Sequence, residues 1–97
     1  MEITGFDWDE GNQAKCLSHG VTTGDIEALF SKPLLIIDDP YDTSRERRYR
    51  AIGQSHNRFI FVVFTLLNGL IRPISARFMH KKEISRYEKD NPDLHQR

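Results

Sequence analysis

Residues 58–78 decide the fold, and they read Arg58-Phe-Ile-Phe-Val-Val-Phe-Thr-Leu-Leu-Asn-Gly-Leu-Ile-Arg-Pro-Ile-Ser-Ala-Arg-Phe78. The pair Asn68-Gly69 favours a tight turn, which predicts a hairpin of two strands over Arg58–Leu66 and Leu70–Phe78. The first strand is apolar on both faces in its middle, so we expect it to be central in a sheet. Pro73 removes one backbone donor, which predicts an edge position or a bulge for the second strand.

Two further strands are predicted upstream of this hairpin. Leu34–Ile37 is a short apolar run, and Arg45–Gly53 is a second extended segment. A polar loop over residues 38–44 joins them, and a turn over Ser55–Asn57 leads into the hairpin. The sequence therefore predicts four mostly antiparallel strands.

Helices are predicted on either side of the strands in the chain. Asp9 is a good N-cap for a helix over Glu10–Ser18, which Gly20 ends. Thr22 caps a second helix, with Asp25 in a capping-box position, and Pro33 closes it. The side chains expected to face the core are Ala14, Leu17, Ile26, Leu29 and Phe30. Cys16 is expected to be a small buried residue.

The last helix is predicted over His80–Lys89, with Ile84 and Tyr87 facing inward. The element order gives a small α+β domain with two N-terminal helices, a mostly antiparallel four-stranded sheet and a C-terminal helix. A chain of 97 residues builds one modest core. We therefore expect a single domain over residues 1–97, with its core at about 6–89 and a frayed tail at 90–97.

Composition excludes several classes of protein. With 38% apolar and 29% charged residues, the chain has an ordinary globular composition. One cysteine excludes an internal disulfide, and the four histidines lack metal-ligand spacing, so we expect no metal and no cofactor. No apolar run approaches the roughly 20 residues of a membrane span. The first residues lack a secretory signal, so we expect a cytoplasmic protein with no membrane partner.

The formal net charge of zero conceals a division between the two halves of the chain. Residues 1–42 hold nine acidic and two basic residues, and residues 43–97 hold twelve basic and five acidic residues. The basic half favours a polyanionic partner. The alternative is a fold that pairs the halves and cancels the charge internally.

The predicted second strand begins with an unusual concentration of arginine. The stretch Arg45-Glu46-Arg47-Arg48-Tyr49-Arg50 places guanidinium groups on both faces of the strand, where like charges repel. Guanidinium forks bind phosphate oxygens, so the pattern favours a phosphate-binding surface. The alternative is a solvated edge strand whose charges prevent aggregation.

A second cluster of cations lies between the last strand and the last helix. Arg77 is followed by His80, Lys81 and Lys82, and cations in a first helical turn oppose the helix dipole unless an anion binds there. The alternative is a surface cluster that Glu83 neutralises. Tyr87 and His19 are weaker site candidates, because Tyr87 fits a core or rim position and His19 fits the end of a helix.

Several segments together resemble the BrnT toxins of type II toxin–antitoxin pairs. The resemblance covers residues 6–89, and its most specific part is Ile74-Ser-Ala-Arg77 with the downstream Glu83 and Tyr87-Glu88. The other matching pieces are Phe6-x-Trp-Asp9, His19-Gly-Val21, Leu29-Phe30, Glu46-x-Arg48 and Ile52-Gly53. The sequence departs from the family at Ser18 and near Asn12, where family members usually have lysines. If the family's lysines contact RNA or the antitoxin, this chain makes that contact more weakly.

The resemblance implies a fold similar to RelE-type ribonuclease toxins and an activity that cleaves RNA and inhibits translation. It also implies a BrnA-like antitoxin with a ribbon-helix-helix part. The toxin–antitoxin complex is expected to bind DNA only through this part of the antitoxin. An RNA partner agrees with the basic second half of the chain. A DNA-binding regulator is disfavoured, because the two N-terminal helices are acidic.

A metal-independent ribonuclease needs a base for the 2′-hydroxyl, an acid for the 5′-oxygen and cations for the charge of the phosphorane. We assign the charge to Arg48 and Arg77, the base to Glu46 or Glu83, and the acid to His80. The residues expected to bind RNA are Arg45, Arg47, Arg50, Lys81 and Lys82. The competing hypothesis is a non-catalytic module that binds RNA or an antitoxin through the same basic face.

Overall fold

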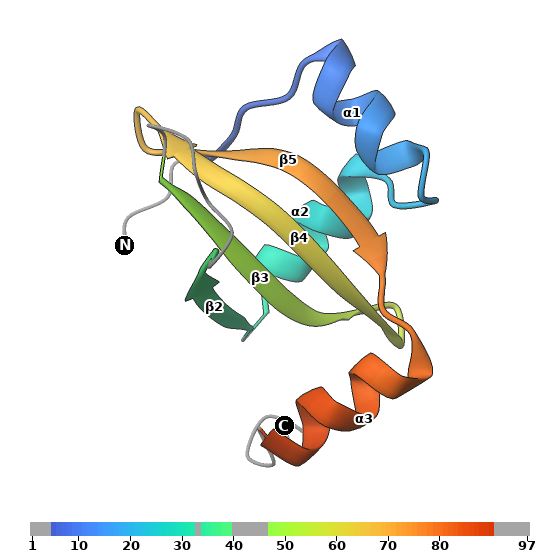
Figure 1. The fold of residues 1–97 in the computed structure, drawn as a ribbon. Coiled ribbons are helices and arrows are strands. Elements are labelled where there is room, and N and C mark those ends of the chain that lie inside the picture. The colour runs from blue at the N-terminus through green and yellow to red at the C-terminus, as the bar shows by residue number, and fades with distance from the viewer. Residues whose placement is uncertain (1–4, 33, 40–46, 91–97) are drawn as a thin grey trace.

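The computed structural model describes residues 5–32, 34–39 and 47–90, which form three helices and five strands (Figure 1). The helices are α1 (Glu10–Leu17), α2 (Thr23–Phe30) and α3 (Lys81–Asp90). The strands are β1 (Gly5–Phe6), β2 (Leu35–Asp38), β3 (Arg48–Ser55), β4 (Arg58–Leu67) and β5 (Leu70–Phe78). The α+β class is confirmed. Some predictions concern residues outside the described part of the chain. They are those for Pro33, the loop at 40–44, Arg45, Glu46 and the tail at 91–97.

The sheet is five-stranded and mixed, so the prediction of a four-stranded sheet is corrected. Its order is β1-β5-β4-β3-β2, and β1 pairs in parallel with β5 through Gly5 opposite Leu70 and Phe6 opposite Ile71. The other three pairings are antiparallel, as expected. A two-residue strand carries no alternating pattern, and the parallel pairing joins residues far apart in the chain, so sequence periodicity does not reveal it.

The hairpin that decides the fold forms as predicted. Asn68 and Gly69 both adopt positive φ angles, of 53° and 78°, which is the conformation that a tight hairpin turn requires. Strand β4 lies between β3 and β5 and is therefore central. The register shifts between Val63 and Phe64, opposite Pro73, so the proline sits at a bulge of an interior strand.

Local capping interactions set the starts of the first two helices. At α1, the Asp9 carboxylate accepts from the Asn12 N–H at 2.8 Å, and the Asn12 side chain accepts from the Asp9 N–H at 2.8 Å. At α2, Thr22 and Asp25 form the equivalent reciprocal pair, with distances of 3.0 and 3.1 Å. Each pair satisfies two backbone donors that the helix itself leaves unpaired.

The prediction that Ala14 and Leu17 face the core is wrong. Both are exposed, Leu17 by 61%, and the buried side chains of α1 are Asn12 and Cys16. The Asn12 amide donates to the Asp7 carbonyl at 3.0 Å and to the Pro73 carbonyl at 2.9 Å. This tertiary contact with β5 rotates a polar residue inward, which an apolar periodicity does not predict.

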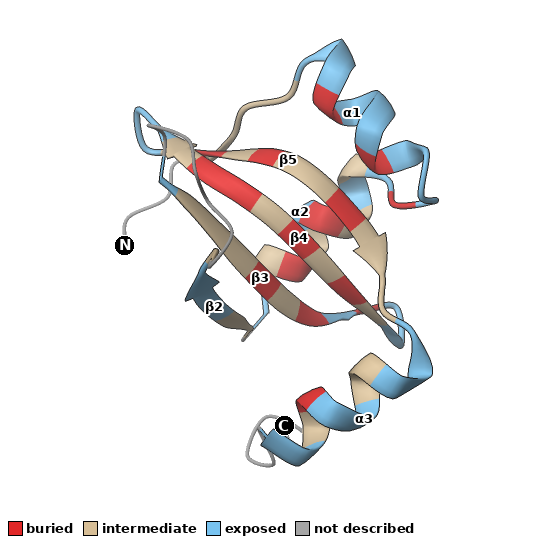
Figure 2. Cartoon of the chain, viewed as in Figure 1, coloured by how far each residue is buried: buried red, intermediate tan, exposed pale blue. Residues whose placement is uncertain are grey.

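The core lies between the sheet and the first two helices (Figure 2). Val21, Ile26 and Leu29 are fully buried against β3, β4 and β5. Gly53 allows this close approach, because a Cβ at this position would lie 2.8 Å from Leu29 Cδ1. No helix among the described residues combines the length and the apolar character of a membrane span.

Candidate active site

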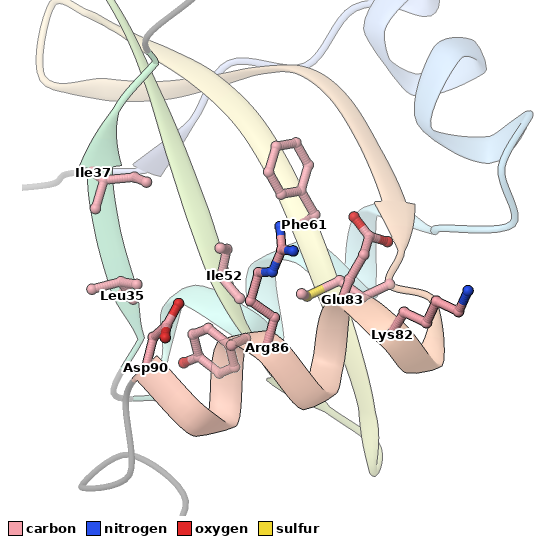
Figure 3. Close-up of a pocket in the computed structure, with 10 residues that line it drawn as sticks. Leu35, Ile37, Ile52, Phe61, Lys82, Glu83, Arg86 and Asp90 are labelled. Atoms are coloured by element: carbon pink, nitrogen blue, oxygen red, sulfur yellow. The ribbon is translucent and has the colours of Figure 1, made fainter.

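The sheet has one face that α1 and α2 cover and a second face over which, among the described elements, only α3 lies (Figures 1 and 3). We call the second face the open face. Residues directly opposite each other on neighbouring strands point to the same side. Ile52, Phe61 and Arg77 form one such row on the open face, and Arg50 and Val63 belong to the next row.

Two arginines lie over the same aromatic ring on the open face. The guanidinium carbon of Arg50 is 5.3 Å from the centroid of the Phe61 ring, and that of Arg77 is 4.9 Å from it. Cation–π attraction offsets part of the repulsion between the two guanidinium groups. The result is a pair of guanidinium groups over one ring of the open face, with β3 supplying one arginine and β5 the other.

Arg77 is held in place by Glu83. Its two terminal nitrogens donate to the two Glu83 oxygens at 2.7 Å each, and Glu83 Oε1 also accepts from the His80 backbone N–H at 2.9 Å. Glu83 therefore caps α3 and fixes the guanidinium of Arg77 at the same time. Glu83 forms an ion pair with Arg77, and its predicted neutralisation of the other cations of this cluster stays a prediction.

These hydrogen bonds control the protonation of the pair. The bonds from Arg77 and from the His80 N–H stabilise the charged carboxylate, so they lower the pKa of Glu83 from 4.5 to about 2. The same contact with Glu83 raises the pKa of Arg77. Near neutral pH, Glu83 is a weak base, and its two hydrogen bonds orient the guanidinium of Arg77.

A groove of about 460 Å³ lies beside this pair, between α3 and the sheet (Figure 3). Its apolar part is formed by Leu35, Ile37, Ile52, Phe61, Met79 and Tyr87. Its charged rim is formed by Lys82, Glu83, Arg86 and Asp90. Tyr87 packs edge-on against Phe59 with ring centroids 5.7 Å apart, and burial raises the pKa of its hydroxyl.

Acidic residues of the first half of the chain pair with arginines of the second half. Asp38 contacts Arg47 at 3.0 Å, and Asp39 contacts Arg50 at 3.1 Å. At the other end of the sheet, Arg72 pairs with Asp7 and with Asp9. The expected internal cancellation of charge is therefore present. It does not exclude the phosphate-binding interpretation, because a phosphate can compete for the same guanidinium groups.

The predicted site residues fall into two groups. Arg77, Glu83 and the backbone N–H of His80 meet at the β5–α3 junction. Glu83, Tyr87 and Lys82 line the groove, and Lys81 is exposed in the first turn of α3. Arg48 lies further away, because its partner Thr65 is four residues from Phe61, roughly 13 Å along β4 at about 3.3 Å per residue. His19 lies in the exposed α1–α2 connection and does not line the groove.

Sequence reasoning missed Phe61 and Arg86. Phe61 sits in an unbroken apolar run, where nothing distinguishes it from its buried neighbours until the strand register is known. Arg86 is three residues after Glu83, a spacing that places both on one side of a helix, and this signal was available from the sequence. The described residues contain no group of three or more His, Cys, Asp or Glu side chains arranged to hold a metal ion.

Lowering the pH is expected to remove the contribution of Glu83 to stability. Its pKa is about 2 in the folded chain against an ordinary 4.5, so the stabilisation is present above pH 4.5 and is lost as the pH falls towards 2. Urea unfolding of the native chain and of Glu83→Gln measures this effect. The difference in unfolding free energy between the two should shrink between about pH 5 and pH 2. A difference that does not change with pH would contradict the lowered pKa.

Comparison with known proteins identifies a family for this chain. The family model described as the ribonuclease toxin BrnT of type II toxin–antitoxin systems matches residues 8–83. This range contains both arginines over Phe61 and ends at Glu83. Neither the curated proteins nor the solved structures give a match.

Proposed function

The chain belongs to the BrnT family of ribonuclease toxins of type II toxin–antitoxin systems, and from this membership we propose that it cleaves RNA without a metal ion. Membership implies an RNA substrate and an antitoxin partner. The observation that carries the proposal is the Arg77 guanidinium, which Glu83 fixes beside Arg50 on the open face. A fixed guanidinium is preorganised to stabilise the negative charge that develops on a phosphorane.

The proposed reaction uses the 2′-hydroxyl of the RNA as the nucleophile. A base accepts its proton, the 2′-oxygen attacks phosphorus, and the bond from phosphorus to the 5′-oxygen breaks. The leaving oxygen takes a proton from an acid. The products are a 2′,3′-cyclic phosphate and a 5′-hydroxyl end, which balances atoms and protons without an additional reactant.

We assign the charge stabilisation to Arg77 with Arg50, and a more distant phosphate contact to Arg48. Glu83 acts as a positioning residue, because a carboxylate with a pKa of about 2 is a poor base. His80 borders Arg77 and Glu83 at the junction, and histidine is the residue type that exchanges protons near neutral pH. His80 is therefore our candidate for proton transfer, with Glu46 as a second candidate.

The remaining cations are proposed to follow the RNA backbone. Lys81 and Lys82 are exposed in the first turn of α3, next to Arg77. Arg47 and Arg50 extend the positive charge along β3, and we expect phosphates to compete with Asp38 and Asp39 for them. Arg45 completes the proposed set of RNA-binding residues.

We further propose a RelE-like arrangement and inhibition of translation through RNA cleavage. The cognate antitoxin is proposed to be BrnA-like, with a ribbon-helix-helix part that alone contacts DNA. An acidic antitoxin segment fits Arg47, just before β3, and Arg50 within it, because Asp38 and Asp39 already pair with them within this chain. The same observation favours the second candidate function, a non-catalytic module that binds an acidic antitoxin or RNA.

The test is cleavage of a labelled RNA by the purified chain in the presence of a chelator and in the absence of ribosomes. We expect fragments that end in a 2′,3′-cyclic phosphate, and no fragments from an RNA in which every 2′-hydroxyl is methylated. Failure of the folded chain to cut RNA under these conditions, together with intact antitoxin binding, would favour the non-catalytic module. Cleavage that depends on added metal would contradict the proposed chemistry.

A further inference from the structure

We propose that the groove between α3 and the sheet binds one nucleobase of the RNA, next to the phosphate that Arg77 holds. This inference rests on the proposed function and deepens it. The groove shares Glu83 and Phe61 with the arginine pair, so a nucleotide whose phosphate contacts Arg77 can place its base there. The groove would then give the protein a preference among RNA sequences.

The size and the lining of the groove suit a nucleobase. A volume of about 460 Å³ lies within the range of small-molecule sites and exceeds what a single base needs. Its floor is apolar, formed by Ile52 and Phe61, and Ile37 borders it from the edge strand β2. Unstacked RNA bases bind to apolar and aromatic surfaces of this kind. Ile37 is 41% exposed, so its side chain is accessible to a ligand in the groove.

Arg86 supplies the second element of this site. Figure 3 shows its side chain rising from α3 over the groove towards Phe61. Arg47, Arg50 and Arg77 are each engaged by a carboxylate. Among the described residues, the Arg86 side chain makes no ion pair and no hydrogen bond. A planar guanidinium stacks on a base and can also donate to its edge.

Asp90 supplies an acceptor at the end of the groove that the last turn of α3 forms. The Glu83 carboxylate already accepts from Arg77 and from the His80 N–H, whereas Asp90 has no partner among the described residues. A carboxylate accepts hydrogen bonds from the amino group of a base. It would repel an acidic side chain placed beside it, so this end of the groove favours a base over an acidic side chain of the antitoxin.

The experiment is a binding titration followed by amide NMR with fully 2′-O-methylated trinucleotides that carry each of the four bases at the centre. These probes lack the nucleophilic hydroxyl, so binding is measured whether or not the chain cleaves RNA. We expect shifts in the residues of the groove and a dissociation constant that depends on the central base. Arg86→Ala and Ile37→Ser should each raise the dissociation constant of the preferred probe by about tenfold, which is the size of effect expected for one stacked base.

Lys89→Ala is the matched control, because it removes one exposed cation from the same helix outside the groove. It should leave the base dependence unchanged. Equal binding of all four probes, or equal weakening by Lys89→Ala and Arg86→Ala, would overturn the proposal and leave a purely electrostatic surface. Unchanged probe binding with weakened antitoxin binding in Arg86→Ala would assign the groove to the protein partner instead. Base-dependent binding by a chain that cuts no RNA would retain this inference and reject the nuclease.

Discussion

Replacing Arg77 by alanine is expected to slow RNA cleavage by about 10²–10³-fold, which is the usual cost of removing one preorganised donor to a transition state. The native guanidinium is fixed by two 2.7 Å hydrogen bonds to Glu83 and lies 4.9 Å from the Phe61 ring centroid. Its removal takes away a cation and also leaves the Glu83 charge uncompensated beside the phosphate. Single-turnover cleavage of a labelled RNA in chelator measures the effect.

Two further variants separate this role from a general loss of charge. Arg77→Lys keeps the cation and loses the planar fork, so we expect an intermediate rate. Arg58→Ala removes a cation that lies over the Phe78 ring at the start of β4, and it should cut RNA at nearly the native rate. Native cleavage by a folded Arg77→Ala chain would remove Arg77 from the site. A loss of equal size in Arg58→Ala would reduce the role of Arg77 to bulk electrostatics.

The largest loss of stability is expected for Phe64→Ala, at about 3–5 kcal/mol of unfolding free energy. Phe64 is fully buried on β4, with its ring centroid 5.2 Å from Phe30 and 5.4 Å from Tyr49. Its truncation leaves a cavity between α2 and the sheet. Since a domain of this size has about 5–15 kcal/mol of stability, the variant loses a large fraction of it. Urea unfolding followed by circular dichroism measures the change.

Matched variants keep this prediction testable if Phe64→Ala fails to fold. Phe64→Leu leaves a smaller void and should cost less than the alanine variant. Leu67→Ala lies on the same strand, where the leucine is 44% exposed, and should cost under about 1 kcal/mol. If Phe64→Leu loses no more unfolding free energy than Leu67→Ala, the ring contacts of Phe64 with Phe30 and Tyr49 do not stabilise the core as predicted.

The arrangement of charge explains how a chain with no net charge can present a basic face. Three arginines are neutralised by aspartates of the first half, and Arg77 by Glu83. In the absence of a ligand, these ion pairs compensate the charges of the four arginines. An RNA phosphodiester offers anionic oxygens with the same single negative charge as a carboxylate, so binding exchanges one set of charge-assisted hydrogen bonds for another. The division of charge along the sequence is therefore compatible both with internal pairing and with an anionic ligand.

Features that depend on residues close together in the chain were predictable from the sequence. The N-caps at Asp9 and Thr22 and the turn at Asn68-Gly69 are set by contacts within about four residues, and each forms as expected. The α+β class follows from the same local signals in order along the chain. Membership of the BrnT family follows from the match of the family model to residues 8–83, which depends on the sequence without reference to the fold.

Tertiary structure alone decided which of the charged and aromatic side chains form the candidate site. The parallel pairing of β1, the inward turn of Asn12 and the position of Arg50 and Arg77 over Phe61 all join residues that are far apart in the chain. The register between strands fixes these contacts, and a shift of one residue would move Phe61 to the opposite face. The sequence by itself therefore determined the three helices, four of the five strands and the family, whereas the packing of the sheet determined where its chemistry converges.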